Sequence, residues 1–197
     1  MVVTACAGSV SSSGVAGAQA GNGACATLQA VIKIVTEPLS TASAQSPGWV
    51  PLQANGWTVF APNSNWALTA SDAGADVNSP DDEQDASLIT WYSLGVPWTF
   101  KTLGAKFVGH LTHVQDLCQT AVARSASGQS QATELVGDLG SQKLRAVLVL
   151  SMLTPTTETY VGESRYVYTP ASQWDMGNAR TLALIVRRAI QSPQSLG

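Results

Sequence analysis

The feature that most constrains the fold is a nearly uninterrupted apolar run, Leu144 to Leu153, with the sequence LRAVLVLSML. A strand with one face in water alternates apolar and polar residues, whereas a strand covered on both faces is apolar almost throughout. The run is too short for a membrane-spanning helix, which needs about 20 predominantly apolar residues. It therefore predicts a central strand of a sheet that other elements cover on both faces.

The segments around this run predict its neighbours in the sheet. Residues 160–169 alternate aromatic and polar side chains, which predicts an antiparallel partner strand for the apolar run. Other short runs between turn signals predict further strands: 75–77, 86–92, 120–124 and 132–136. The acidic segment 81–85 is placed at the tip of the hairpin that joins the first two of these strands.

A further β-hairpin is predicted near residue 60. Residues 56–62 and 65–69 are short runs of strand-forming residues, and the turn residues Pro62, Asn63 and Ser64 separate them. The stretch before them, 38–56, is rich in Pro, Ser and Gly and is predicted to be a connecting loop.

Three segments have the apolar spacing of an amphipathic helix: 25–35, 99–117 and 179–190. The first is rich in β-branched residues, which leaves a strand possible there. In the second, Thr99 is placed to cap a helix of about five turns whose apolar residues recur from Leu103 to Leu117. Asp175 or Asn178 can cap the third helix, and Pro193 stops it.

The charge balance bears on the class of partner. The chain carries 10 Lys and Arg against 13 Asp and Glu, a net charge of −3, and shows no basic stripe. Proteins that bind nucleic acid hold its phosphates with clustered Lys and Arg, so we do not expect a nucleic acid partner.

The order of the predicted elements is helix, hairpin, strands, helix, strands, helix. By the rules of layer packing, this order predicts an α+β fold in which helices sandwich an antiparallel β-sheet. A length of 197 residues fits one compact domain plus a tail. We place a single domain at 25–197, preceded by a tail at 1–24.

The tail is interpreted as a flexible tether. Residues 7–24 consist mainly of Ala, Gly and Ser, and their few apolar side chains bury too little surface to offset the entropy of ordering. Before them, Val3-Thr4-Ala5-Cys6 resembles the bacterial lipobox, which implies lipidation at Cys6. The regions of a signal peptide that should precede it are missing, so we expect either that the signal peptide was trimmed or that the start codon was assigned too late. The alternative is that Cys6 is an ordinary cysteine in a flexible tail.

Cysteine usage points to the same compartment. If Cys6 carries the lipid, Cys25 and Cys118 remain as an even pair in a chain with 3 cysteines. An exported protein would join them in a disulfide, which we expect here. The alternative is two buried free thiols that behave as small hydrophobic groups.

The two histidines of the chain, His110 and His113, precede Asp116 at intervals of three residues. On the predicted helix all three side chains would project from one side, so they could bind a metal ion. This metal-binding protein or metal-dependent enzyme is the alternative function. Solvated histidines on the polar face of the helix are the favoured interpretation.

A second group of possible cation ligands is the acidic segment around residue 80. Its oxygen-bearing side chains could bind Ca²⁺, but they lack the spacing of an EF-hand, so a solvated acidic turn is favoured. These side chains are Asp76, Asn78, Asp81, Asp82, Glu83 and Asp85. We find no nucleophile motif such as G-x-S-x-G and no phosphate-binding loop, so no catalytic residue, metal or cofactor is expected.

Partner contacts are assigned to loops. Trp49 and Trp98 lie near Pro47 and Pro97 in loops, where large rings have less core to enter. Exposed together, they would form a contact patch for another molecule. With Asp81 and Asp82 of the acidic turn, they are the predicted partner-binding residues.

The sequence resembles the PsbP-like family over residues 56–192. The resemblance rests on Gly56-Trp57-Thr58-Val59-Phe60-Ala61-Pro62 followed by Trp66, on the turn at Pro80-Asp81-Asp82, and on a closing strand that leads into a C-terminal amphipathic helix. The family includes the extrinsic subunit of the photosynthetic oxygen-evolving complex, bacterial lipoproteins and a nuclear-transport factor that binds a small GTPase. The resemblance implies an accessory or binding domain that is not an enzyme, and it assigns no functional residue.

These observations predict a lipid-anchored, exported accessory protein on the extracytoplasmic side of the bacterial cell envelope. We expect it to act through contacts with another envelope protein and to meet the membrane through its N-terminal lipid. The sequence does not indicate a small-molecule ligand.

Overall fold

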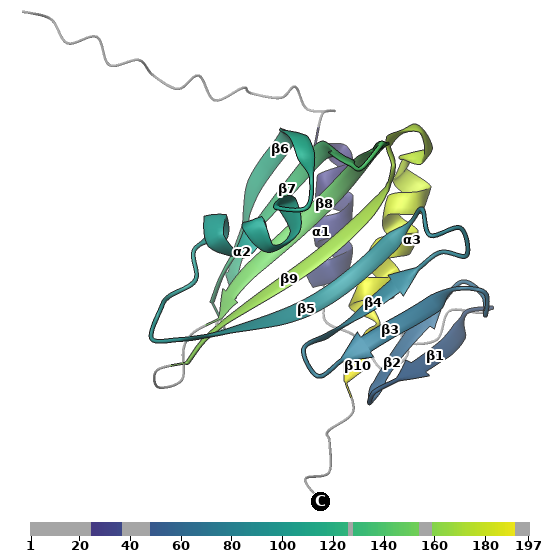
Figure 1. Ribbon diagram of the computed structural model, residues 1–197, viewed down its shortest axis with the longest axis horizontal. Coiled ribbons are helices and arrows are strands. Elements are labelled where there is room, and N and C mark those ends of the chain that lie inside the picture. Colours follow the sequence, from purple (N-terminus) through teal and green to yellow (C-terminus); the bar gives the residue numbers. More distant parts are fainter. Residues whose placement is uncertain (1–24, 37–47, 126–127, 154–158, 192–197) are drawn as a thin grey trace, which may run out of the picture.

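The computed structural model describes residues 25–36, 48–125, 128–153 and 159–191. Its main feature is a seven-stranded antiparallel sheet with the strand order β3-β4-β5-β9-β8-β7-β6 (Figure 1). The strands are β3 (Ala67–Ser71), β4 (Gly74–Asn78), β5 (Asp85–Leu94), β6 (Thr112–Ser125), β7 (Gly128–Leu139), β8 (Gln142–Leu153) and β9 (Thr159–Pro170). A three-stranded antiparallel sheet contains β1 (Val50–Ala54), β2 (Trp57–Ala61) and β10 (Ile190–Gln191).

Helices cover both faces of the large sheet. The helices α1 (Ala26–Thr36) and α3 (Met176–Arg187) pack against each other and on one face, while α2 (Phe100–Val108) lies on the other (Figure 1). A short 3₁₀ helix, η2 (Ala171–Gln173), connects β9 to α3. The structure is therefore the predicted α+β arrangement, an antiparallel sheet between layers of helices. None of the helices in the described part of the chain has the length and apolarity needed to cross a bilayer.

The central strand confirms the prediction from the apolar run. Along β8, Val147 and Val149 belong to the core beneath α1 and α3, while Leu148 and Leu150 belong to the core beneath α2. Successive side chains of a strand point to opposite faces, so an apolar residue is needed at each position where both faces are covered, from Ala146 to Leu150. The strand β9 pairs with β8 in antiparallel register, as the alternation of residues 160–169 predicted.

The second predicted helix is wrong beyond its first nine residues. Helix α2 ends at Val108, Gly109 caps it, and β6 begins at Thr112. Residues 112–117 pair with β7 instead of continuing the helix, although their apolar spacing fits both structures. The strand predicted at 120–124 is confirmed as the second half of β6. Gly109 lowers the helical tendency at this point, and pairing with β7 decides the outcome. The expected cap at Thr99 is present: its Oγ1 accepts a hydrogen bond from the N–H of Thr102.

The hairpin near residue 60 is also wrong in its pairing. The strand β2 pairs with β1, which lies in the segment predicted as a loop, and β3 pairs with β4 in the large sheet. Asn55 and Gly56, both with positive φ, form the turn between β1 and β2. An Asn-Gly pair is a strong signal for a two-residue hairpin turn.

The remaining elements largely follow the predictions. The first helix forms as expected, and the carboxylate of Asp175 caps α3 by accepting the N–H of Asn178. Ile190 lies exposed on β10 instead of on the helix face. Trp57 and Trp66 are buried in the core, although Trp66 lies outside the strands.

Candidate functional site

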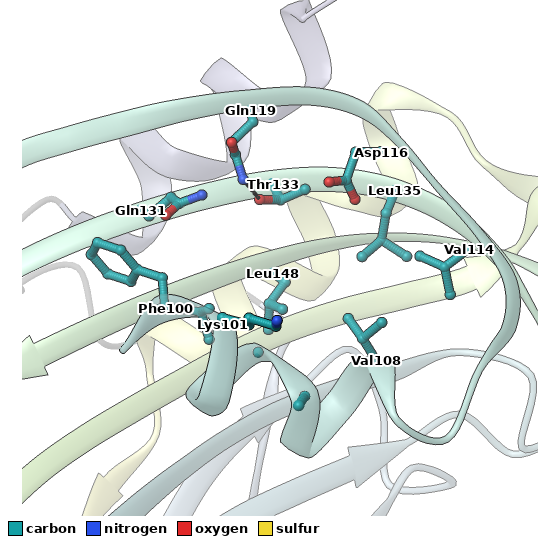
Figure 2. A pocket seen from close by; sticks show the side chains of 13 residues that line it. Phe100, Lys101, Val108, Val114, Asp116, Gln119, Gln131, Thr133, Leu135 and Leu148 are labelled. Carbon is teal, nitrogen blue, oxygen red and sulfur yellow. Dashed lines mark hydrogen bonds between the residues drawn. The ribbon is translucent and has the colours of Figure 1, made fainter. Parts of the chain in front are cut away.

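A groove opens where α2 leaves part of the sheet uncovered. The helix packs on β8 and β9, while β6 and β7 face it across an open space of about 650 Å³ (Figure 2). Ligand pockets in proteins have volumes of about 300–1,000 Å³. The groove is therefore large enough to receive a small molecule or a short segment of another protein.

Close packing along α2 sets the wall of this groove. Leu103 is fully buried and packs with Leu148 and Leu150 of β8. Gly104 allows the helix to approach the sheet, since a Cβ atom at this position would lie 3.3 Å from Cδ1 of Leu150. The capping box formed by Thr99 and Thr102 fixes the first turn of the helix, from which Phe100 and Lys101 reach the groove.

The groove combines an apolar floor with a polar side. Leu135, Leu148 and Leu150 supply apolar surface, and Gln119, Gln131 and Thr133 supply hydrogen-bonding groups. The Nε2 of Gln119 donates a hydrogen bond to Oγ1 of Thr133 at 3.2 Å. Figure 2 shows Phe100 at one end of the groove and Val108 and Val114 at the other.

Two opposite charges border this space: Lys101 on α2 and Asp116 on β6. Neither a histidine nor a cysteine is among the described residues that line it. The arrangement can bind apolar groups on the floor and hydrogen-bond polar ones at the side. Nucleophilic catalysis needs a nucleophile beside an activating base, and the lining does not include an evident pair of that kind.

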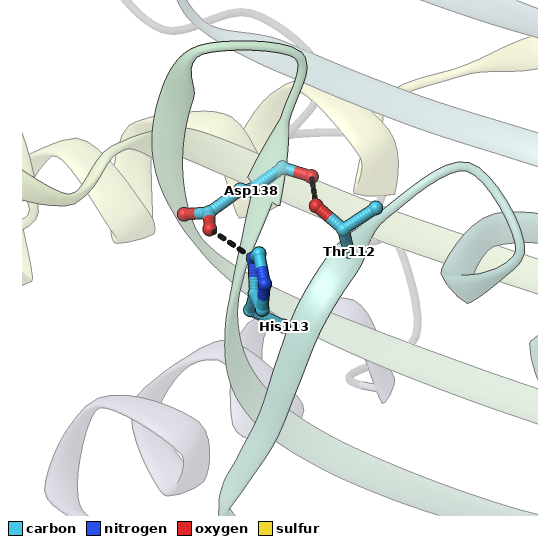
Figure 3. A network of polar contacts seen from close by, with 3 residues as sticks. All are labelled: Thr112, His113 and Asp138. Atoms are coloured by element: carbon cyan, nitrogen blue, oxygen red, sulfur yellow. Dashed lines mark hydrogen bonds and ion pairs between the residues drawn. The ribbon is translucent and has the colours of Figure 1, made fainter.

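The predicted metal ligands do not come together. His110 lies exposed in the turn after α2, and Asp116 faces the groove. His113, with a positive φ, lies on β6, where its Nδ1 is 2.9 Å from Oδ2 of Asp138 (Figure 3). Within the described ranges, no group of three or more His, Cys, Asp or Glu side chains could hold a metal ion. The metal hypothesis needed a helix through residue 117, and that helix is absent.

The predicted tryptophan patch does not form. Trp49 is half-buried against the core beneath α1 and α3, with the guanidinium of Arg188 4.8 Å from the centre of its ring. Trp98 is half-buried in the separate core beneath α2, with Nζ of Lys106 6.0 Å from its ring. The two rings therefore belong to different cores on opposite faces of the sheet.

The predicted acidic residues shape the turn between β4 and β5. Asp81 and Asp82 are exposed. The carboxylate of Asp81 accepts hydrogen bonds from the hydroxyl of Ser79 and the N–H of Glu83, and the bond from Ser79 is the main reason its pKa is lowered. Asp82 has a positive φ and accepts a hydrogen bond from Nδ2 of Asn78 at 2.9 Å. A role for these two residues in partner binding stays a prediction.

Two of the 3 cysteines form a disulfide. Cys25, next to the start of α1, forms a disulfide with Cys118 of β6, and their Cα atoms are 5.8 Å apart. This separation lies within the usual range for a disulfide. The bond joins helix α1 to the strand at one edge of the large sheet. Cys6 lies outside the described residues.

Sequence reasoning missed two groups of residues. The groove residues Phe100, Gln131 and Thr133 come from α2 and β7, which are remote from each other in sequence, and only the packing of α2 on the sheet brings them together. The second group is a polar cluster around Asp76 and Asp85 on the same face of the sheet. Both residues had been noted in the acidic segment, but their burial depends on the pairing of β4 with β5 and of β5 with β9.

Comparisons with known proteins give structural likeness only. No protein-family model and no curated protein matches the sequence. Among solved structures, a mutant of the protein Mog1 is similar with a TM-score of 0.41 and 13% identity, covering 77% of this chain and 99% of its own. LpqN of Mycobacterium tuberculosis, described as involved in cell envelope biogenesis, is similar with a TM-score of 0.45 and 12% identity, covering 74% of this chain and 91% of its own. At these values neither likeness carries a functional argument.

Proposed function

We propose that this protein is a non-catalytic binding domain, exported and lipid-anchored at the bacterial cell envelope, which receives a segment of another envelope protein. The observation that carries the proposal is the groove between α2 and the strands β6, β7 and β8. Its apolar floor and hydrogen-bonding side suit a protein segment that has both kinds of group. The resemblance to the PsbP-like family, which implies an accessory role, supports the same function.

The location rests on the cysteines and the N-terminal pattern. Disulfides persist mainly in oxidising compartments outside the cytosol, so the Cys25–Cys118 bond supports export. The Val3-Thr4-Ala5-Cys6 pattern and the tether that follows it supply the means of anchoring. Two or more acyl chains suffice to hold a protein stably on a bilayer.

Site-specific photocrosslinking in the native host tests the groove. A photoreactive amino acid is introduced at Gln131, which lines the groove, and in a matched variant at Gln53, which is exposed on β1 of the small sheet. We expect a discrete protein adduct from position 131 that does not form from position 53. Charge reversal at Lys101 should weaken that adduct, since this residue borders the groove. Equal labelling at both positions, or none at 131, would refute binding in the groove.

Intact mass of the protein isolated from its host tests the anchor. An N-terminus at Cys6 with added acyl mass, and two alkylation sites that appear only after reduction, is the expected result. A lipid-free chain with three free thiols would rule out both the anchor and the oxidised compartment.

A further inference from the structure

A polar cluster lies on the face of the large sheet that carries α2. It is formed by β4, β5 and β9, whereas the groove lies over β6, β7 and β8 on the other side of the helix. Its residues come from three neighbouring strands, and strand register places them on one face: Asn78 is opposite Asp85, Asp76 is opposite Ser87, and Asp85 and Ser87 are opposite Tyr168 and Tyr166. Side chains directly opposite each other on antiparallel strands have Cβ atoms about 4.5–5.5 Å apart. The oxygens of Asp76, Asn78 and Asp85 therefore gather in a small region.

One hydrogen bond and the strand register tie the members of this cluster together. The hydroxyl of Ser87, which lies opposite Tyr166, donates to Oδ1 of Asp76. Asp76 and Asp85 are diagonal neighbours on β4 and β5, and the charge of Asp76 acts on the carboxyl group of Asp85. Two carboxylates in contact repel each other unless a positive charge or a proton lies between them.

Burial makes a negative charge on Asp85, next to that of Asp76, energetically unfavourable. Asp85 is only 4% exposed, and the burial of its carboxyl group, followed by the nearby Asp76 and Asp82, raises its pKa to about 10. The ion pairs formed by described residues join other groups: His113 with Asp138, Arg145 with Glu134, and Arg165 with Glu163.

Two oxygen acceptors of the cluster have no hydrogen-bond partner among the described residues. Oδ1 of Asp85 and Oδ1 of Asn78 are both buried and unpaired in the structure, and the two residues face each other across β4 and β5. A proton shared between Asp76 and Asp85 would relieve the repulsion but would not supply a partner for Oδ1 of Asn78. A cation bound among the three side chains would neutralise the carboxylates and supply a partner for both acceptors.

We propose that Asp76, Asn78 and Asp85 bind a divalent cation of the calcium class. Ca²⁺ takes six to eight oxygen ligands from carboxylates, amide oxygens and water. Here two carboxylates and one amide oxygen come from the protein. Asp76 and Asn78 are half-buried, and a cavity of about 150 Å³ next to Asp76, which Asn78 and Asp85 do not line, can hold water on that side of the site. Bound there, the cation joins β4 to β5 at the base of the acidic turn.

Thermal unfolding of the full chain, first stripped of metal with a chelator, tests the proposal. At Ca²⁺ concentrations about 100-fold above the Kd, we expect the midpoint to rise by about 5–10 °C. Asp76→Asn and Asp85→Asn should each abolish this rise. Asp116→Asn, which removes a carboxylate on the distant strand β6, should retain it.

Two further measurements keep the test decisive if one variant folds poorly. Asn78→Asp adds a third carboxylate and should lower the Kd for Ca²⁺, measured by calorimetry. Tb³⁺, which binds calcium sites, should show luminescence on excitation of the neighbouring Tyr166 and Tyr168, and Ca²⁺ should compete it away. If neither Ca²⁺ nor Tb³⁺ binds the wild-type chain, or if binding survives Asp76→Asn, the proposal is overturned and the carboxyl pair shares a proton. This outcome is independent of the crosslinking result for the groove.

Discussion

Leu103 of α2 packs directly against the backbone of β9 at Gly162. A Cβ atom at residue 162 would lie 2.9 Å from Cδ1 and 3.1 Å from Cδ2 of Leu103, which is itself fully buried. Because α2 forms the wall of the groove, this contact sets how closely the wall approaches the sheet. Glycine at position 162 is therefore part of what positions the candidate site.

Gly162→Ala should destabilise the protein, because the added methyl group forces Leu103 and its helix away from β9. Overpacking of this kind typically costs about 1–3 kcal/mol. Urea unfolding of the variant measures the loss. Leu103→Ala alone leaves a cavity and should cost about 2–5 kcal/mol. The double variant should lose less than the sum of the two, and strict additivity would show that the two residues do not interact.

The contact between Leu103 and Gly162 illustrates which parts of the fold the sequence could predict. The strand β8 was predictable because a nearly continuous apolar run is stable in a sheet only where other elements cover both faces. The boundary between α2 and β6 was not, because residues 103–117 satisfy a helical spacing and only the pairing with β7 decides between helix and strand. The Asn55-Gly56 pair is a local signal for the hairpin of β1 and β2, which the predicted loop at 38–56 did not include.

The candidate sites were less predictable than the fold. Asp76 and Asp85 are nine residues apart, and their burial depends on strand register across β4, β5 and β9. The groove depends on how far α2 extends over the sheet, which follows from contacts such as that of Leu103 with Gly162. Such tertiary relationships leave no periodic signal in a single sequence.

The disulfide between Cys25 and Cys118 should contribute substantially to stability. It closes a loop with a sequence separation of 93 residues, and removing a native disulfide from a small exported domain typically costs about 2–5 kcal/mol. Replacing both cysteines with serine should therefore lower the free energy of unfolding by that amount. Adding a reductant should destabilise the wild type and leave the double variant unchanged. An equal response of the two proteins would show that the bond is not formed in solution.

The raised pKa of Asp85 predicts how stability depends on pH in the absence of cations. The unfolded chain releases this proton near the usual aspartate value of 3.8, while the folded chain holds it up to about 10. The contribution of Asp85 to stability is therefore fully present below 3.8 and is lost as the pH rises toward 10. We therefore compare the two proteins in the presence of chelator. The free energy of unfolding of the Asp85→Asn variant minus that of the wild type should increase as the pH rises from 3.8 toward 10.

Urea unfolding in chelator at several pH values measures this difference. Asp116→Asn is the matched control, and it should follow the wild type. With calcium present, the proposed site predicts the opposite effect for Asp85→Asn, since the wild type then gains the stabilisation that the variant lacks. A constant difference between Asp85→Asn and the wild type at all pH values in chelator would contradict the buried, protonated carboxyl group.

Glu134 of β7 and Arg145 of β8 form an ion pair, and substitutions of the two should have strongly non-additive effects on the free energy of unfolding. Glu134 is completely buried, its Oε1 is 2.7 Å from an Arg145 guanidinium nitrogen, and the guanidinium lies 5.5 Å from the Trp174 ring. Arg145→Met leaves a buried charge without its partner, which typically costs about 3–5 kcal/mol. Replacing both residues with methionine should recover most of that loss, because two apolar side chains need no partner.

A partly exposed ion pair on β9 provides the control. Glu163 and Arg165 of β9 also form an ion pair, at 2.8 Å, but both side chains are partly open to solvent. Glu163→Gln should therefore change stability by less than about 1 kcal/mol, the usual range for a surface pair. Guanidinium unfolding of the three variants checks the order of their effects. A loss from Arg145→Met no larger than that from Glu163→Gln would mean that water reaches Glu134, and the packing of β7 and β8 beneath α1 would then be looser than the structure shows.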